Sequence, residues 1–329
     1  LSSTIYTSTP QGSWGVDGGA GLVSLPAGAM AAGEGALEVA VPLDHLSGQF
    51  QPGARFNVRL AVIQGNGVTL YPPQGPALLA LPDEAVPNVV VEVEDPTGDD
   101  HGPGTYVYPR DPVFRGGAYD ATRLVVGYDD EDVIFRLSFR GAVENDWGAP
   151  NGMGIHTVDI YLDVDGPGNG ARLLLPGRNA ALPEAYAWDY AIWAEGWTPG
   201  IYQPGDEGPV QMDGRLEIST NPAQRRITVR VSRRAIPGDP ATWSYAVVVA
   251  SQEGYPAAGV WRIREVLPVA EQWRVGGGPE DTNHTRILDV IYPAAGVQEA
   301  MLADYRPSQA SVGELGPDDF GQVPVITPE

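Results

Sequence analysis

The chain has 329 residues, a net charge of −22 at pH 7 and no cysteine. The charge argues against nucleic acid as a partner, because its phosphates would be repelled, and the lack of cysteine excludes disulfides and thiol chemistry. No apolar run is long enough to cross a bilayer, so no membrane span is expected. The 42 glycines and 31 prolines indicate many short strands joined by turns, in a chain long enough for two domains.

Residues 1–83 are expected to form a small all-β unit. Strand-like composition recurs in LSSTIYTST, ALEVAV, FNVRLAVIQ and VTLY. With the motif PLDHL, these segments resemble the closing half of a DOMON-like sandwich. An incomplete sheet with an exposed N-terminal strand would pair with another copy of the chain, whereas the alternative is a small sheet that packs against the second domain.

An acidic, glycine-rich stretch follows the first strand of the second domain, which is expected to span residues 84–329 after the short linker LPDEAVPN. Asp95, Asp99 and Asp100 lie close together in DPTGDDHGPG, and Asp120 ends the same stretch. Carboxylates this close repel one another unless water or a cation separates them, and calcium takes oxygen ligands from flexible loops. The residues leave two interpretations open, a calcium site that pins the loop to the sheet and a solvated acidic turn.

Two predicted strands, TRLVVGYDD and EDVIFRLSFRG, form a hairpin at the turn 129–132. The next strand, IHTVDIYLDVDG, alternates between two faces and ends in Asp163 and Asp165. These two carboxylates repeat the oxygen-rich chemistry of the first loop and suggest a second cation site. The alternative, which the residues favour, is an Asp-Gly turn closed by its own backbone hydrogen bonds.

Aromatic residues gather in AWDYAIWAEGW, which contains Trp188, Tyr190, Trp193 and Trp197. On a strand, Trp188 and Tyr190 project to one face and Trp193 to the other. Exposed aromatic faces bind sugars through the C–H surface of the sugar ring. These four residues are therefore candidate glycan ligands, together with Trp147 in a loop of glycine and proline. The alternative for the cluster is packing in the core of a sandwich.

The remainder of the domain predicts strands in GRLEIST, RRITVRVS, WSYAVVVASQ and GVWRIREV, and a short helix in VQEAMLADY. Charges of both signs between Arg262 and Asp289 predict ion pairs that close the sandwich. The final segment, GPDDFGQVPVITPE, has the proline and acid content of an interdomain linker, so the chain is expected to be a piece of a larger protein.

Four blocks of the second domain resemble one known family. They are DPTGDDHGPGTYVYPRDPVFRGGAYD, NDWGAPNGMGIHTVDIYLDVDGPGNGARLLLPGRN, AWDYAIWAEGW, and GVWRIREV with EQWRVGGGPEDTNHTRILDVIYP. In this order, across residues 88–293, they are similar to the C-terminal module of glucodextranase, which also occurs in type II pullulanases and surface-layer-anchored proteins. The resemblance implies an antiparallel β-sandwich related to DOMON and family 9 carbohydrate-binding folds, an accessory role in binding glycan or cell wall, and structural calcium.

Two functions of different class follow. The first is a non-catalytic, extracellular or cell-surface module that binds an α-glucan or a cell-wall glycan and is stabilised by calcium, as the resemblance implies. The second is a structural subunit of a self-assembling surface layer or filament, joined by strand exchange through residues 1–83. An enzyme is not expected, because the sequence contains no G-x-S-x-G, P-loop or H-E-x-x-H motif and its four histidines are scattered singly.

Overall fold

The computed structural model describes residues 85–166, 169–256 and 258–328, together with short strands and the turn at 73–74 within the first 84 residues. The chain divides into two compact units, Leu1–Glu84 and Ala85–Glu329. In the first unit, β1 pairs with β2, β3 with β4, β5 with β8 and β6 with β7, all antiparallel. These strands are β1 (Thr7–Ser8), β2 (Trp14–Gly15), β3 (Met30–Gly33), β4 (Ala36–Val39), β5 (Arg55–Val58), β6 (Leu60–Gln64), β7 (Gly67–Tyr71) and β8 (Ala77–Ala80). The expected DOMON-like half-sandwich and its strand exchange lie outside the described residues.

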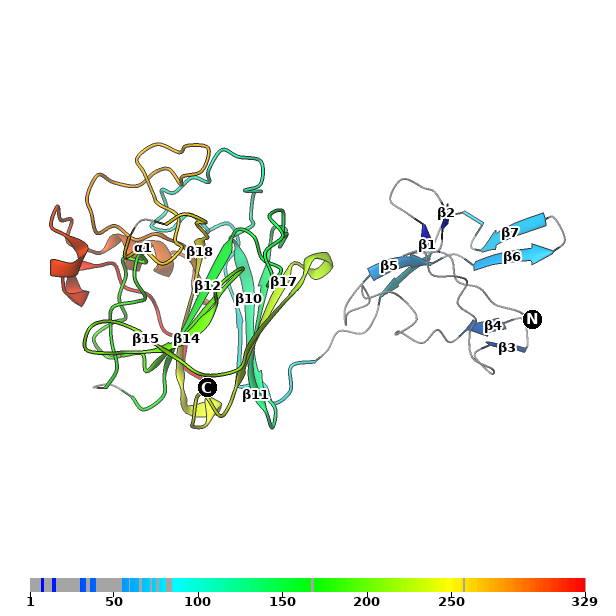
Figure 1. The fold of residues 1–329 in the computed structure, drawn as a ribbon, viewed down its shortest axis with the longest axis horizontal. Coiled ribbons are helices and arrows are strands. Elements are labelled where there is room, and N and C mark those ends of the chain that lie inside the picture. Colours follow the sequence, from blue (N-terminus) through cyan, green and yellow to red (C-terminus); the bar gives the residue numbers. More distant parts are fainter. Residues whose placement is uncertain are drawn as a thin grey trace. The chain divides into compact units, whose positions relative to one another are not determined.

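The second unit contains two antiparallel sheets, which confirms the predicted β-sandwich (Figure 1). The five-stranded sheet has the order β16-β17-β11-β10-β9, and the six-stranded sheet has the order β15-β14-β13-β12-β18-β19. The strands are β9 (Val91–Glu94), β10 (Ala121–Tyr128), β11 (Asp132–Phe139), β12 (His156–Asp163), β13 (Tyr190–Glu195), β14 (Gly200–Gln203), β15 (Val210–Met212), β16 (Leu216–Asn221), β17 (Arg226–Ser232), β18 (Ser244–Ser251) and β19 (Ile287–Val290). The helix α1 (Val297–Ala303) confirms the predicted short helix.

The main hydrophobic core lies between the two sheets. The hairpin of β10 and β11 forms as predicted, and Leu124 and Phe135 from it pack with Ile160 of β12. The other face of the six-stranded sheet is covered as well, because Tyr161 and Val248 belong to a second hydrophobic cluster with residues from 174–188 and from α1. Every residue of β12 is therefore buried, the polar ones included.

Two predictions about the C-terminal third are wrong. The segment GVWRIREV forms only isolated β-bridges, and Arg262 within it has φ of 48°, a left-handed conformation that interrupts an extended chain. The final segment packs within the second unit and does not form an exposed linker, because Phe320, Val323 and Ile326 are buried. Ile326 forms a β-bridge with Tyr245, which holds this segment against β18.

Long loops gather at one end of the sandwich, where Figure 1 draws residues 95–120 in teal and residues 252–286 in orange. Val107 and Gly276 form a β-bridge, and Arg110 N donates to Glu271 O at 2.8 Å. Residues far apart in the sequence are thus brought together at this end, where the candidate sites lie.

Candidate functional site

Three aspartates from distant segments form an acidic centre. Asp95 and Asp99 follow β9, Asp289 is in β19, and one carboxylate oxygen from each lies within 4.8 Å of the others. Asp95 and Asp289 are buried and Asp99 is partly buried. Because β9 and β19 belong to different sheets, the centre joins the two layers of the sandwich.

Burial opposes the charge of these carboxylates. It is the largest cause that raises the pKa of Asp95 to about 8 and the pKa of Asp99 to about 6. Burial, and then the charges of Asp95 and Asp99, raise the pKa of Asp289 well above its usual value. Three carboxylates that oppose one another's ionisation lie together stably only with protons or a cation between them.

The hydrogen bonds of the acidic centre do not satisfy all of its oxygens. Asp95 Oδ1 accepts from Tyr292 N at 2.7 Å, and Asp289 Oδ2 accepts from Ala121 N at 2.7 Å. Asp95 Oδ2 and Asp99 Oδ1 are buried without a hydrogen-bond partner. Buried acceptors without a donor are rare in folded proteins, and carboxylate oxygens are the ligands of calcium. The donor set therefore fits a hard divalent cation.

Asp100 and Asp120, the other two predicted ligands of this loop, lie outside the three-aspartate group. Asp120 Oδ2 accepts from Gly98 N at 2.8 Å and pairs with Arg140 Nε at 2.5 Å, and Asp100 accepts from the Tyr108 hydroxyl. Arg140 thus partly offsets the negative charge here. The Oδ1 atoms of both aspartates are nevertheless buried without a hydrogen-bond partner.

Sequence reasoning did not assign Asp289 and Glu299 to this acidic centre; Asp289 was predicted only as part of the run of ion pairs. The charge of Glu299, in α1, helps to raise the pKa of Asp99, and its Oε2 atom is buried without a hydrogen-bond partner. An acid inside the apolar run ILDV was the available signal for Asp289, because a carboxylate is rarely buried without a partner. Glu299 lies in the predicted helix VQEAMLADY, and its position there gave no indication that it would be near these aspartates.

The second predicted pair, Asp163 and Asp165, lies with Asp189 in another acidic group. Asp163 Oδ1 accepts from Gly166 N at 2.8 Å, and Asp189 Oδ2 accepts from Val164 N at 2.7 Å. Among the described residues, no carboxylate oxygen of this group is both buried and without a partner. These hydrogen bonds match the Asp-Gly turn, and the group carries no argument for an ion.

Three of the predicted glycan ligands are buried. Trp188 is 1% exposed, Tyr190 8% and Trp193 6%. Trp188 and Trp193 pack on the outer face of the six-stranded sheet, whereas Tyr190 packs between the sheets, so the predicted pairing of Trp188 with Tyr190 is wrong. The reason is that β13 begins at Tyr190, and the alternation of side chains does not extend back to Trp188. These three rings contribute to packing, as the alternative interpretation held.

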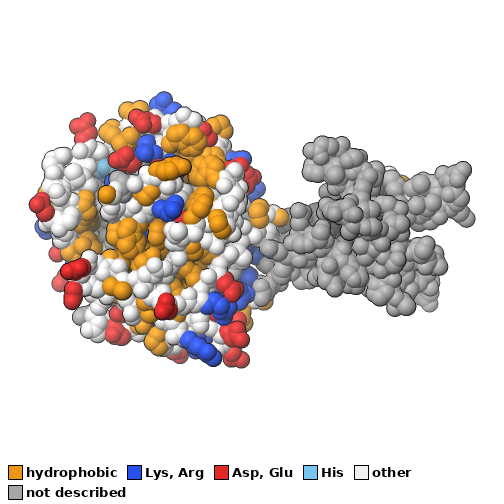
Figure 2. All heavy atoms as spheres, in the orientation of Figure 1, with side chains coloured by type: hydrophobic (Ala, Val, Ile, Leu, Met, Phe, Trp, Pro, Cys, Tyr) orange, Lys and Arg blue, Asp and Glu red, His pale blue; other side chains and the backbone are white. Residues whose placement is uncertain are grey.

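The other two predicted ligands, Trp147 and Trp197, come together with Trp273 in a group that we call the tryptophan surface, in which Trp197 is partly buried. The Trp147 ring centroid lies 6.5 Å from that of Trp197 and 6.3 Å from that of Trp273, with tilts of 35° and 54°. Trp147 and Trp273 are each 39% exposed, and the buried Phe114 ring contacts both edge-on. Figure 2 shows hydrophobic side chains between arginines and acids toward the end of the second unit where the long loops gather. Because the three rings are tilted, they do not lie in one plane.

Arg264 supports the tryptophan surface from the buried side, through contacts with Phe114 and Trp273. It is almost fully buried, its guanidinium lies 4.9 Å from the Phe114 ring centre, and it donates to Trp273 O at 2.6 Å. Glu253 pairs with Arg264 at 3.1 Å and with Arg274 at 2.8 Å. Part of the predicted run of ion pairs therefore exists, and it positions aromatic rings.

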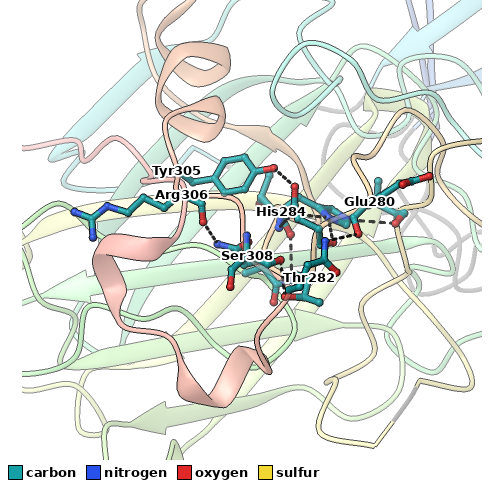
Figure 3. Close-up of polar contacts among 12 residues, drawn as sticks. Glu280, Thr282, His284, Tyr305, Arg306 and Ser308 are labelled. Carbon is teal, nitrogen blue, oxygen red and sulfur yellow. Dashed lines mark hydrogen bonds and ion pairs between the residues drawn. The ribbon is translucent and has the colours of Figure 1, made fainter.

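A polar network fastens the C-terminal segment to the loop before β19 (Figure 3). Thr282 N donates to Ser308 O at 2.9 Å, and the Tyr305 hydroxyl donates to Asp281 Oδ2 at 2.7 Å. His284 Nδ1 lies 3.3 Å from Asp281 Oδ1. His284 therefore has a structural role, since it contacts Asp281, which in turn binds Tyr305 of the C-terminal segment.

A family model for the C-terminal, SLH-like binding module of glucodextranase matches residues 90–315. The matched region is well over half of the chain and contains both the acidic centre and the tryptophan surface. The chain belongs to this family. The family resemblance drawn from the sequence is confirmed, and the glucodextranase module is by description a binding module. No curated protein matches the chain. Among the described residues, no helix has both the length and the apolar character to cross a membrane.

Proposed function

We propose that the second unit is a non-catalytic glycan-binding module whose binding site is the tryptophan surface. The observation that carries the proposal is the exposure of the indole rings of Trp147 and Trp273 beside the partly buried Trp197, in a member of a binding-module family. Indole faces cover the C–H surface of a pyranose, while neighbouring charged groups bind its hydroxyls. Arg115, which pairs with Asp146 at 2.9 Å beside Trp147, is such a group.

The tilt between the rings of the tryptophan surface favours an α-glucan or a cell-wall glycan of similar shape. Chains of α-linked glucose coil, whereas β-1,4-linked chains lie flat, and rings tilted by 35° and 54° do not present a flat platform. The SLH-like description of the family supports a place outside the cell, at its surface, as part of a larger carbohydrate-active protein.

The acidic centre would hold one calcium ion through Asp95, Asp99 and Asp289, with Glu299 nearby. What supports this assignment is the pair of buried, unpartnered oxygens on Asp95 and Asp99. A bound ion supplies the positive charge that lets buried carboxylates stay ionised. In a chain without cysteine, it would join the loop after β9 to β19.

Isothermal titration calorimetry and affinity electrophoresis with soluble starch, dextran and purified cell wall test the glycan assignment. Trp147→Ala and Trp273→Ala are each expected to weaken binding about fivefold or more, because each loses an aromatic contact worth about 1 kcal/mol. Tyr255→Ala is the control, since this ring is 93% exposed and lies outside the tryptophan surface. The proposal fails if the wild type binds none of these glycans, or if the double tryptophan variant binds as the wild type does.

A further inference from the structure

A group of buried polar side chains lies on the outer face of the six-stranded sheet. Thr157 pairs with Glu195 across β12 and β13 and with Ala250 across β12 and β18. Trp193 and Gln252 lie two residues from Glu195 and Ala250, so they face the same side. We call Thr157, Trp193, Glu195 and Gln252 the polar cluster.

Five atoms of the polar cluster have no hydrogen-bond partner: Thr157 Oγ1, Trp193 Nε1, Glu195 Oε2, and both Oε1 and Nε2 of Gln252. Thr157, Glu195 and Gln252 are 0% exposed. Each buried polar atom without a partner is destabilising, and folded proteins contain few of them. Packing alone does not account for five such atoms on four neighbouring side chains.

Aromatic rings border the polar cluster. The Trp193 ring centroid lies 5.7 Å from that of Trp261 and 6.2 Å from that of Tyr202, and the Trp261 and Tyr202 centroids are 4.9 Å apart. Trp261 is partly exposed. The aromatic group therefore extends from the cluster to the surface.

The rim of the polar cluster is shared with the tryptophan surface. Thr198 N donates to Glu195 Oε1, so Glu195 holds the turn that carries Trp197. The Arg262 guanidinium lies 6.0 Å from the centre of the Trp197 ring, and the residue after Arg262 forms a β-bridge with Gln252. The left-handed φ of Arg262, 48°, is unusual for a residue other than glycine and marks this rim as a strained position.

We propose that the polar cluster is a second sugar site, which takes one terminal pyranose of the glycan. This inference rests on the proposed function and adds the chemistry of the chain end. A hydroxyl, a carboxylate, a primary amide and an indole N–H offer donors and acceptors for several sugar hydroxyls, and the rings of Trp193 and Trp261 offer an apolar wall.

The charges around the cluster select a neutral sugar. The nearby Arg178 guanidinium, 5.4 Å from the Trp193 ring centre, is already paired with Asp159 at 2.6 Å, so the carboxylate of Glu195 would repel an anionic sugar. The atoms that would bind the sugar are buried, so we infer that the site takes the end of a chain and not a segment within it. Because the five atoms are shielded from solvent, sugar binding would require Trp261 and Arg262, at the rim of the cluster, to move aside.

Glucose titration of the full chain tests the second site, with the melting temperature (Tm) and tryptophan fluorescence as readouts. Glucose is expected to raise the Tm saturably in the wild type. Gln252→Met removes the amide with little change in volume, so the free variant is expected to melt about 2–4 °C higher and to bind glucose about tenfold more weakly. Gln309→Met, an exposed change of the same chemistry, should leave both readouts unchanged.

Trp147→Ala separates this inference from the proposed function, since it should lose affinity for soluble starch and keep the glucose response. The second site is wrong, and the proposed function survives, if starch binds but glucose has no effect, or if Gln252→Met binds glucose as the wild type does. A crystal structure at saturating glucose with only water on the five atoms would also overturn it. If soluble starch, dextran, purified cell wall and glucose all fail to bind, both proposals fail.

Discussion

Replacing Asp95 by asparagine tests the acidic centre, because the change removes one charge and keeps the shape. Asparagine retains the acceptor for Tyr292 N and puts an amide nitrogen where Asp95 Oδ2 has no partner. In the wild type, calcium at 100 times its dissociation constant would stabilise the fold by about 2.7 kcal/mol. In a unit of this size, that raises the Tm by about 5–11 °C. Asp95→Asn is expected to lose most of this rise and to be more stable than the wild type in EDTA, because one buried carboxylate is gone.

Calorimetry of both proteins in calcium and in EDTA measures the effect, and their order of stability should reverse between the two buffers. The pH dependence has a definite sign in EDTA. The native pKa of Asp95 is about 8 against an ordinary value of 3.8, so the contribution of Asp95 to stability is greatest below about pH 4 and falls as the pH rises to about 8. The exposed Asp165→Asn control should respond to calcium as the wild type does. A wild-type Tm that is equal in calcium and in EDTA would refute the assignment.

Three further changes test the scaffold. Burial lowers the pKa of His156 to about 4 from 6.5, so about 3 kcal/mol of stability is lost as the pH falls between these values, and urea unfolding should show that His156→Gln removes this slope. Arg264→Met should cost about 3 kcal/mol and weaken starch binding even where the variant is fully folded, because Phe114 and Trp273 lose their support. Phe320→Ala should cost about 3–5 kcal/mol in urea unfolding, although it lies beyond the matched family region.

Alternation of side chains predicted most strands of the sandwich, because burial of at least one face imposes a period of two. It worked for β12, where Val158, Ile160 and Leu162 all pack between the sheets. It failed for GVWRIREV, where the left-handed φ of Arg262 accompanies contacts with Trp197 and with the end of β18, neither of which is local in sequence.

The candidate sites were predictable only in their local parts. Asp95 and Asp99 belong to one loop, so their spacing in the sequence predicts that they lie close together. Asp289 is distant in the sequence and reaches them only because β19 pairs with β18. Likewise, Trp147 was a predicted glycan ligand because it is an aromatic residue in a loop of glycine and proline. Trp273 lies beside it only because the segment between β11 and β12, which contains Trp147, and the loop 252–286, which contains Trp273, pack at the same end of the sandwich.

The acidic centre and the tryptophan surface are connected by one loop. Residues 95–120 begin at Asp95 in the centre and end at Asp120 beside it, and Phe114 of this loop is the ring beneath Trp147 and Trp273. Removal of the cation would release the Asp95 end of the loop that carries Phe114. The affinity for soluble starch is therefore expected to fall in EDTA, at a temperature where the sandwich stays folded, and to recover when calcium is added.

The variant Asp95→Asn provides the decisive comparison for this connection. Because an asparagine lies buried beside Asp99 and Asp289 without needing a proton or an ion, the loop should stay anchored in EDTA, and starch affinity should change little between calcium and EDTA. Titration calorimetry of both proteins in both buffers measures the difference, with circular dichroism as the control for folding. Equal wild-type affinity in the two buffers would show that packing alone holds Phe114, since Arg264 stacks on the same ring whether or not the ion is present.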